Sequence, residues 1–122
     1  GLSYTDFKYS NLNLSSENLK GNQTLTVNVN VANTGKFDGE EVVQLYIRDL
    51  FGKVVRPIKE LKGFQKIFLK KGESRNVTFK LTPDDLKFYD DALNYDWEAG
   101  EFEIMVGTNS SDVMVKKIVW EK

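Results

Sequence analysis

The feature that most constrains this chain is a run of alternating apolar and polar residues in its first half. Every second residue of Leu25–Val31 is apolar, and Val43–Ile47 repeats the alternation after a turn region that contains Gly35 and Gly39. Side chains of a β-strand point alternately to its two faces, so a period of two predicts strands with one apolar face. We predict that these two strands are paired, and that a second layer of the protein covers their apolar face.

The first of these strands is followed by Asn33-Thr34-Gly35. Asparagine and glycine adopt positive φ more readily than other residues do. We therefore expect a turn with positive φ at this point, where the strand must end.

Similar apolar runs recur along the rest of the chain, with a turn signal roughly every ten residues, as in β-sandwiches. A threonine cap, a proline and two acids predict one short helical turn near Pro83–Leu86. We therefore predict an all-β sandwich of seven or eight strands. The expected strands are Tyr4–Leu14, Leu25–Val31, Val43–Ile47, Phe64–Leu69, Asn76–Leu81, Tyr95–Trp97, Glu101–Val106 and Val113–Trp120.

Three segments depart from simple alternation. The apolar parity of Tyr4–Leu14 changes after Tyr9, which predicts a bulge or a switch from one sheet to the other. Ser15–Gly21 is polar and is expected to form a turn. Val54–Lys62 contains Pro57, whose missing N–H predicts a connection or an edge strand.

Size and charge narrow the class of protein. The 122 residues fit one domain over 1–122, which can bury a core without disulfide bonds. The formal net charge is −1, so we expect no nucleic-acid partner. No apolar run reaches the roughly 20 residues of a membrane-spanning helix, so we expect no membrane partner.

Composition also limits the chemistry. The chain has no histidine and no cysteine, so catalysis would depend on carboxylates. The acidic clusters each lie in a predicted turn or helix cap, where backbone geometry alone favours acids. We therefore predict no catalytic residue, no metal site and no cofactor. The clusters are Asp38/Glu40/Glu41, Asp84/Asp85 and Asp90/Asp91.

Exposed aromatic side chains offer another route to function, because sugar rings stack on flat aromatic faces. Aromatic residues make up 12% of the chain, and most are expected to fill the core or an inter-domain contact. A carbohydrate-binding or adhesive module therefore stays open as an alternative. The candidates for stacking are Tyr46, Phe51, Tyr89, Tyr95, Trp97 and Trp120.

Several ordered motifs together resemble one family, and they cover essentially the whole chain. They are Asn33-Thr34-Gly35 with Gly39; Glu41-Val42-Val43-Gln44-Leu45-Tyr46; Arg56-Pro57 with Lys59-Glu60-Leu61-Lys62-Gly63-Phe64; Leu69-Lys70-Lys71-Gly72-Glu73-Ser74; and Gly100-Glu101-Phe102 with Val106-Gly107. The set resembles the C-terminal fibronectin type III-like domain of family-three glycoside hydrolases, the β-glucosidase and β-xylosidase group. Gly1–Thr5 is similar to the junction where that domain leaves the preceding α/β domain, so we expect a segment of a longer enzyme.

The resemblance implies a non-catalytic accessory domain. In the family, the nucleophilic aspartate lies in a Ser-Asp-Trp motif of the first, barrel domain, and the acid/base residue usually lies in the second domain. Asp96-Trp97 matches two letters of that motif, but Tyr95 precedes it and no catalytic role is carried over. The implied partners are the catalytic domains of the same polypeptide and a homodimer partner. Export to the periplasm or secretion is implied for the parent enzyme.

A docking surface is expected between Phe51 and Phe64. This stretch combines a long connection, an arginine able to form bidentate hydrogen bonds, and apolar residues that a free-standing domain would leave in water. The candidate inter-domain docking residues are Phe51, Arg56, Pro57, Leu61 and Phe64.

Overall fold

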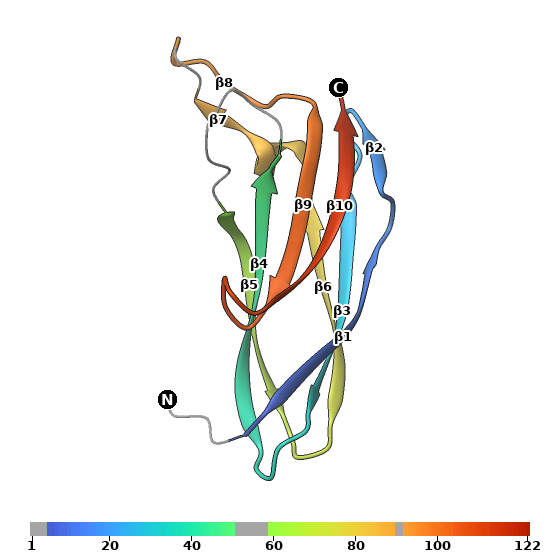
Figure 1. The fold of residues 1–122 in the computed structure, drawn as a ribbon, viewed down its shortest axis with the longest axis vertical. Helices are drawn as coiled ribbons and strands as arrows, with labels where there is room; N and C mark the ends of the chain where they lie inside the picture. The colour runs from blue at the N-terminus through green and yellow to red at the C-terminus, as the bar shows by residue number, and fades with distance from the viewer. Residues whose placement is uncertain (1–4, 51–58, 90–91) are drawn as a thin grey trace.

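A computed structural model describes residues 5–50, 59–89 and 92–122, which form a two-layer β-sandwich (Figure 1). The strands are β1 (Phe7–Leu14), β2 (Asn18–Lys20), β3 (Leu25–Asn33), β4 (Gly39–Asp49), β5 (Lys59–Leu69), β6 (Ser74–Leu81), β7 (Phe88–Tyr89), β8 (Tyr95–Asp96), β9 (Gly100–Gly107) and β10 (Val113–Glu121). A 3₁₀-helix, η1 (Pro83–Leu86), lies between β6 and β7. The predicted all-β sandwich with one short helical turn is confirmed.

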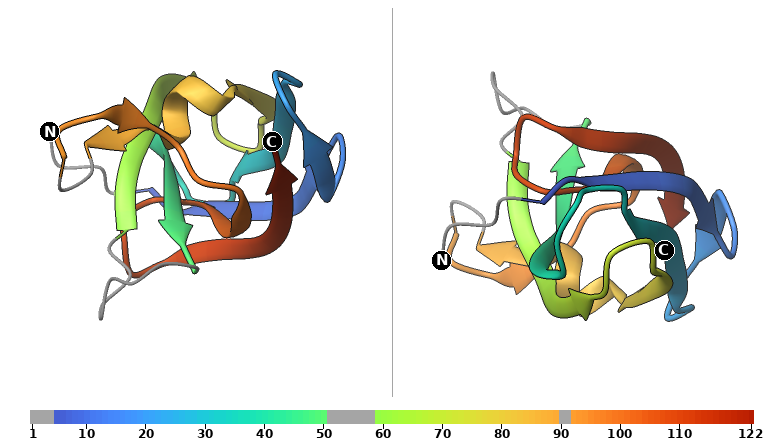
Figure 2. Two further views of the ribbon diagram at one scale, coloured as in Figure 1. Left: turned by 90° about the horizontal axis from the view of Figure 1, so that it is seen from above. Right: turned by 90° about the horizontal axis from the view of Figure 1, so that it is seen from below.

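The strands divide between two main sheets. One sheet has the order β1-β3-β6, and the other has the order β2-β10-β9-β4-β5. The short pair β7-β8 lies at the end of the sandwich where β4 and β10 finish (Figure 1). Viewed from its ends, the molecule shows the strands arranged around one central core (Figure 2). Both sheets send their apolar faces into that core, because a sheet with one apolar face must bury it.

The predicted pairing of the two central strands is wrong. β3 pairs with β1 and β6, whereas β4 pairs with β5 and β9 in the opposite sheet. Their inward side chains, such as Val29 and Leu45, are both buried in the shared core. Alternation shows which face of a strand is apolar, but it carries no information about which strand lies alongside.

The turn after β3 is also built differently from the expectation. Gly35 does not have positive φ, whereas Gly21 and Gly72 do. A Cβ placed on Gly35 would come within 2.0 Å of Thr5 Oγ1 and 2.5 Å of the Asp6 backbone nitrogen. Glycine is needed at this position because two backbone segments approach closely, and not because of a left-handed conformation.

Asn33 ties the two sheets together at this turn. Its side chain is buried, and its Oδ1 accepts hydrogen bonds from Thr5 Oγ1 (2.6 Å) and the Gly35 N–H (3.0 Å). Its Nδ2 donates to the carbonyl groups of Phe37 (2.8 Å) and Leu69 (3.1 Å). Since Asn33 ends β3 and Leu69 ends β5, one amide joins strands of opposite sheets.

Two segments between the expected strands contain β-strand residues. Ser15–Gly21 was expected to be a turn, but Asn18–Lys20 forms β2, which runs parallel to β10 and buries Leu19. A strand of three residues is too short to show alternation. Val54–Lys62 is predicted to be a connection or an edge strand, and its described part, residues 59–62, belongs to β5. The alternative of an edge strand is confirmed, since β5 is outermost in its sheet.

Two irregularities set the directions of side chains. The register of β1 shifts between Ser10 and Asn13, with Asn11 at φ 55°, which confirms the bulge predicted in the first strand. A second shift occurs in the β4–β5 pair, where Leu45 faces Gly63 but Tyr46 faces Leu61. The second bulge was not predicted, although Gly63 lies beside its extra residue and an isolated glycine in a strand often marks a bulge.

Candidate docking surface

The outer face of the five-stranded sheet carries most of the exposed apolar side chains of β4 and β5. Val43, Leu45 and Ile47 of β4 are buried in the core, so Val42 and Tyr46 point outward. The register continues this outer face across the sheet, from Leu61 through Tyr46 and Met105 to Val115. We call six outward residues the outer patch: Val42, Tyr46, Leu61, Phe64, Met105 and Val115.

The outer patch combines strongly exposed residues with a buried centre. Phe64 is 65% exposed, Leu61 is 51% exposed, and Val42 and Val115 are also exposed. Met105, by contrast, is 1% exposed, although it lies outside the core cluster formed by Phe102, Ile104, Val106 and their neighbours. The patch therefore has one apolar side chain already out of water and several others still in water.

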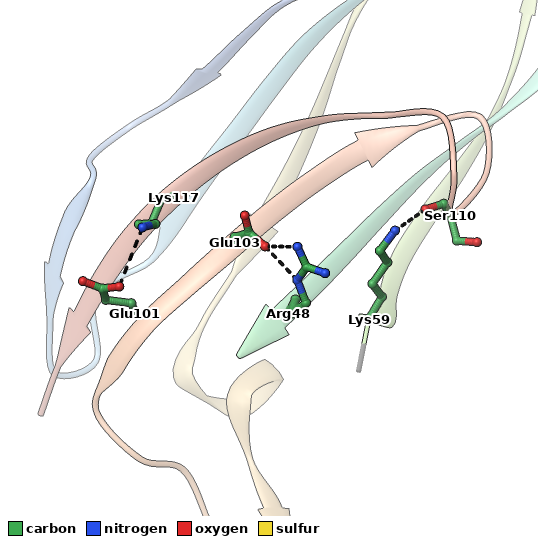
Figure 3. Close-up of polar contacts among 6 residues, drawn as sticks. All are labelled: Arg48, Lys59, Glu101, Glu103, Ser110 and Lys117. Atoms are coloured by element: carbon green, nitrogen blue, oxygen red, sulfur yellow. Dashed lines mark hydrogen bonds and ion pairs between the residues drawn. The ribbon is translucent and has the colours of Figure 1, made fainter. Parts of the chain in front are cut away.

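Charged residues of β4, β9 and β10 follow the Tyr46–Met105–Val115 row in the strand register and so border the outer patch. Figure 3 shows the pairs that they form. Arg48 Nε donates to Glu103 Oε1 over 2.7 Å, and Arg48 Nη2 contacts the same oxygen. Lys117 Nζ lies 3.8 Å from Glu101 Oε2 (Figure 3). An apolar centre with a polar rim is the usual arrangement in protein–protein interfaces.

Two further lysines complete this border. Lys59 Nζ donates to the Ser110 carbonyl over 2.6 Å and so links the start of β5 to the loop before β10 (Figure 3). At the opposite side of the outer patch, Lys66 Nζ lies 3.0 Å from Glu40 Oε2. Each acid on the border therefore already has a cationic partner within the domain.

Of the five predicted docking residues, the structure describes two. Leu61 and Phe64 lie together on β5 and form one edge of the outer patch. Phe51, Arg56 and Pro57 lie outside the described residues. Sequence reasoning missed the other strands of this face, although the outward parity of Val42 and Val115 was available as a signal.

The acidic clusters serve the backbone or pair with other side chains. Asp38 accepts a hydrogen bond from the Lys71 N–H (2.8 Å), and Asp85 accepts one from the Thr82 N–H (2.8 Å). The expectation that Glu40 and Glu41 lie in a turn is wrong, because both belong to β4. Asp90 and Asp91 lie outside the described residues.

Glu41 takes part in a polar contact between β1 and β4. Tyr9 Oη donates to Glu41 Oε2 over 2.9 Å, beside an open pocket that Asp112 also lines. Burial raises the pKa of the Tyr9 phenol well above its ordinary value, and the Glu41 and Asp112 carboxylates raise it further. Tyr9 is therefore held as the neutral donor in this contact.

Asp96-Trp97, which matches part of the family's nucleophile motif, packs near the C-terminal end of β10. Asp96 accepts a hydrogen bond from Lys122 Nζ (3.0 Å), which lowers the pKa of its carboxyl group, and another from the Trp97 N–H (2.8 Å). Trp97 is buried, and its ring meets the Trp120 ring edge-on at 6.2 Å. Lys122 Nζ lies 5.2 Å from the centre of the Trp97 ring.

The remaining stacking candidates form an exposed pair on the β7-β8 hairpin. Tyr89 is 68% exposed, and its ring centre lies 4.7 Å from that of Tyr95, with 37° between the ring planes. Lys87 Nζ lies 5.7 Å from the Tyr95 ring and covers part of it. These two rings pack on one another and do not form a flat platform.

The described part of the chain has neither a metal-binding cluster of acids nor a membrane-spanning helix. Within 5–50, 59–89 and 92–122, no group of three or more acids is placed to hold a metal ion. Over the same residues, no helix has the length and apolar character needed to cross a bilayer.

Comparison with known proteins agrees with the fold. The sequence profile of the family "Fibronectin type III-like domain" matches residues 41–110. The chain is 44% identical over 121 residues to thermostable beta-glucosidase B of Acetivibrio thermocellus. This match covers 98% of the chain and 16% of that protein. It is 46% identical over 112 residues to a putative beta-xylosidase of Formosa agariphila. This second match covers 92% of the chain and 15% of that protein.

Solved structures give the same result. The beta-glucosidase of Listeria innocua in complex with gluconolactone matches 100% of the chain at a TM-score of 0.91 and 36% identity, over 17% of its own length. The GH3 beta-glucosidase of Bifidobacterium adolescentis matches 98% of the chain at a TM-score of 0.85 and 37% identity. The chain thus spans 15–18% of the length of these relatives. It belongs to the family of fibronectin type III-like domains.

Proposed function

We propose that this chain is a non-catalytic accessory domain of a family-three β-glucosidase-like glycoside hydrolase, which packs on the catalytic domains of the same polypeptide and stabilises them. One observation carries the proposal: the match runs over nearly the whole chain but over only 15–16% of the β-glucosidase and β-xylosidase relatives. In enzymes built this way, the remaining five-sixths of the polypeptide has room for the whole catalytic machinery.

The positions of the acids support a non-catalytic role. A glycosidase needs two carboxyl groups facing one cleft, about 5 Å apart if it retains configuration and wider if it inverts. Asp38 and Asp85 accept backbone hydrogen bonds, whereas Glu41 pairs with Tyr9. Each of these carboxylates already has a structural partner.

The docking surface is proposed to include Phe51, Arg56, Pro57, Leu61 and Phe64. The exposure of Leu61 and Phe64 supports it, because large apolar side chains held in water favour contact with another surface. Arg56 would add hydrogen bonds to carbonyl groups of the catalytic part. Arg56→Ala in the full-length enzyme is therefore expected to lower the melting temperature, and an unchanged melting temperature and activity would exclude Arg56.

The proposal is tested first on the reading frame that surrounds this segment. An α/β barrel with a Ser-Asp-Trp motif upstream of Gly1 is expected, and a reading frame without catalytic domains would refute the proposal. The isolated 122-residue chain is then assayed with aryl glucosides. No turnover is expected, and hydrolysis by the purified fragment would show that the domain itself is an enzyme.

The exposed Tyr89–Tyr95 pair favours one alternative, a free-standing carbohydrate-binding or adhesive module. Gel retardation of the isolated chain in soluble glucans and pull-down on cellulose distinguish the two. We expect neither, because the two rings are tilted and Lys87 covers one of them. Retardation that is lost in Tyr89→Ala would favour the module instead.

A further inference from the structure

We infer that the outer patch as a whole, across β5, β4, β9 and β10, is the contact surface of this domain, and that its occupant is an uncharged, apolar surface of the catalytic part of the same polypeptide. This inference rests on the proposed function and extends the expected docking site. It moves the centre of the contact from the Phe51–Phe64 stretch to the middle of the sheet, around Met105.

The first step is the grouping of apolar residues by strand register. Leu61, Tyr46, Met105 and Val115 form a continuous row across four adjacent strands. Phe64 lies in the next row, opposite Gln44, and Val42 follows one row beyond. Gln44 is the polar member of this face, and Tyr46 Oη donates to its Oε1. Residues distant in sequence therefore form one mainly apolar surface, and such surfaces on monomers commonly mark interaction sites.

The second step is the charge of the border. Its basic residues are Arg48, Lys59, Lys66 and Lys117, and its acidic residues are Glu40, Glu101 and Glu103, so the four and three nearly cancel. All three acids lie within 4 Å of a lysine or arginine of the same domain. A partner with a strong charge of either sign would find no complement here, so an uncharged apolar partner fits best.

The third step is preorganisation. Met105 is 1% exposed at the centre of the patch, so its side chain has little freedom left to lose on binding. The Arg48–Glu103 pair also holds its two strands in register beside the centre. A partner would therefore meet a surface that is largely fixed and loses little conformational entropy on binding. Burial of the Leu61 and Phe64 side chains would then contribute to affinity with little entropic cost to offset it.

The fourth step identifies the occupant. The relatives in which this domain occurs are about six times longer than this chain, so each carries a large neighbouring surface on the same polypeptide. A tethered neighbour acts at a high effective concentration and needs less intrinsic affinity than a separate molecule. The catalytic part is therefore favoured over a second copy of the domain.

The test uses the full-length polypeptide with Phe64→Ser and Leu61→Ser. Phe37→Ser is the matched control, because Phe37 is 60% exposed but lies in the turn between β3 and β4, outside the patch. We expect each patch variant to lower the melting temperature by on the order of 5 °C and to speed proteolytic release of the domain. We expect Phe37→Ser to change neither.

Two measurements make the result specific. In the isolated 122-residue chain, Phe64→Ser and Phe37→Ser are both expected to leave the melting temperature within about 2 °C of the parent, since both side chains are exposed. In the full-length protein, raising the salt concentration from about 0.05 to 1 M is expected to leave proteolytic release unchanged, because charge pairing contributes little.

The outcomes separate this inference from the proposed function. If deleting the domain destabilises the enzyme but Phe64→Ser behaves like Phe37→Ser, the domain docks through another surface. That result overturns this inference together with the docking role of Phe64, while the accessory role of the domain stands. Salt-dependent release would overturn the uncharged partner. A dimer of the isolated chain that Phe64→Ser dissociates would make a second copy the occupant. A reading frame without catalytic domains would overturn both proposals.

Discussion

The two sheets of this sandwich present opposite chemistry to the outside. On the three-stranded sheet, outward residues of β3 and β6 are polar: Thr78 Oγ1 donates to Asn28 Oδ1 (2.5 Å), and Asn76 Nδ2 donates to the same oxygen (3.4 Å). On the five-stranded sheet, the outer patch places Leu61 and Phe64 in water. Both sheets send equally apolar side chains into the core, so the difference lies entirely on the outside.

This difference indicates where a neighbouring surface can bind. Covering the polar face would take hydrated amides and hydroxyl groups out of water, and each would need a new hydrogen-bond partner. Covering the outer patch removes apolar area from water and disturbs few polar groups, so burial there is favourable. One sheet is therefore suited to remain in solvent and the other to be covered.

The two outer faces belong to one rigid unit only if the two sheets are firmly joined, and Asn33 provides the largest test of this. Asn33→Ala is expected to destabilise the isolated chain by about 3 kcal/mol, because it leaves buried partners such as the Leu69 carbonyl and the Thr5 hydroxyl without their hydrogen bonds. Urea unfolding of the variant measures the loss. Asn30→Ala, on the outer face of the same strand, serves as the control and should cost less than about 0.5 kcal/mol.

Equal losses in the two variants would mean that the Asn33 amide does not join the sheets. Each sheet would then behave as an independent layer.

The next test compares the centres of the two outer faces. Met105→Ala is expected to cost about 2–3 kcal/mol, because it removes a side chain that is already buried. Asn28→Ala, near the centre of the polar face, is expected to cost about 1 kcal/mol or less, because its partners can bind water instead. Thermal unfolding of both variants of the isolated chain gives the two values. A Met105→Ala loss no larger than that of Asn28→Ala would contradict a preorganised patch.

A pH titration examines the contact between the sheets at Tyr9. The pKa of Tyr9 is raised in the folded state, so folding favours the protonated phenol. The resulting stability is fully present below pH about 10, the ordinary pKa of tyrosine, and is lost as the pH rises toward the folded value. We expect the free energy of unfolding to fall more steeply above pH 10 in the parent than in Tyr9→Phe, with a cost of about 1 kcal/mol for Tyr9→Phe at pH 7.

Parallel curves for the two proteins above pH 10 would show that Tyr9 does not titrate differently in the folded state. Tyr89→Phe, which removes the hydroxyl group of an exposed tyrosine, serves as the control for the substitution itself.

The smallest expected effect concerns the charged border. Glu103→Gln is expected to cost about 0.5–1 kcal/mol, because the Arg48–Glu103 pair is partly shielded from solvent. Glu40→Gln removes the more exposed Lys66 pair and should cost less than about 0.3 kcal/mol. Chemical denaturation at low and high salt measures both. A larger loss of stability in Glu40→Gln than in Glu103→Gln would show that the border beside Met105 is not the more ordered part of this face.

Much of the fold could be predicted from local pattern. Alternation in Leu25–Val31 and Val43–Ile47 identified the inward faces correctly, and the parity change after Tyr9 located a bulge. Strand partners could not be predicted, because they depend on contacts between residues far apart in the sequence. Gly35 shows the same limit: glycine was recognised, but its reason is a close approach to Thr5, thirty residues earlier.

The candidate docking surface could be predicted in part. Leu61 and Phe64 stood out because large apolar residues occurred near Pro57, in a stretch that does not read as a central strand. The contributions of Met105 and Val115 required the register of β9 and β10, and the outward direction of Leu61 required the bulge opposite Tyr46. Sequence indicated one edge of the surface, and the three-dimensional arrangement supplied its centre.

The parallel pairing of β2 with β10 has a consequence for the order of folding. Trp120 Nε1 donates to the Gly21 carbonyl, 99 residues earlier, and Val119 N–H donates to the Glu17 carbonyl. β2 can therefore pair with its neighbour, and the Trp120 ring can be buried, only after β10 has been synthesised. Until then, Leu19 and the free edge of β9 have no partner, and such surfaces promote aggregation during synthesis. On the ribosome, this domain should complete its core in one late step, at the arrival of Val113–Glu121.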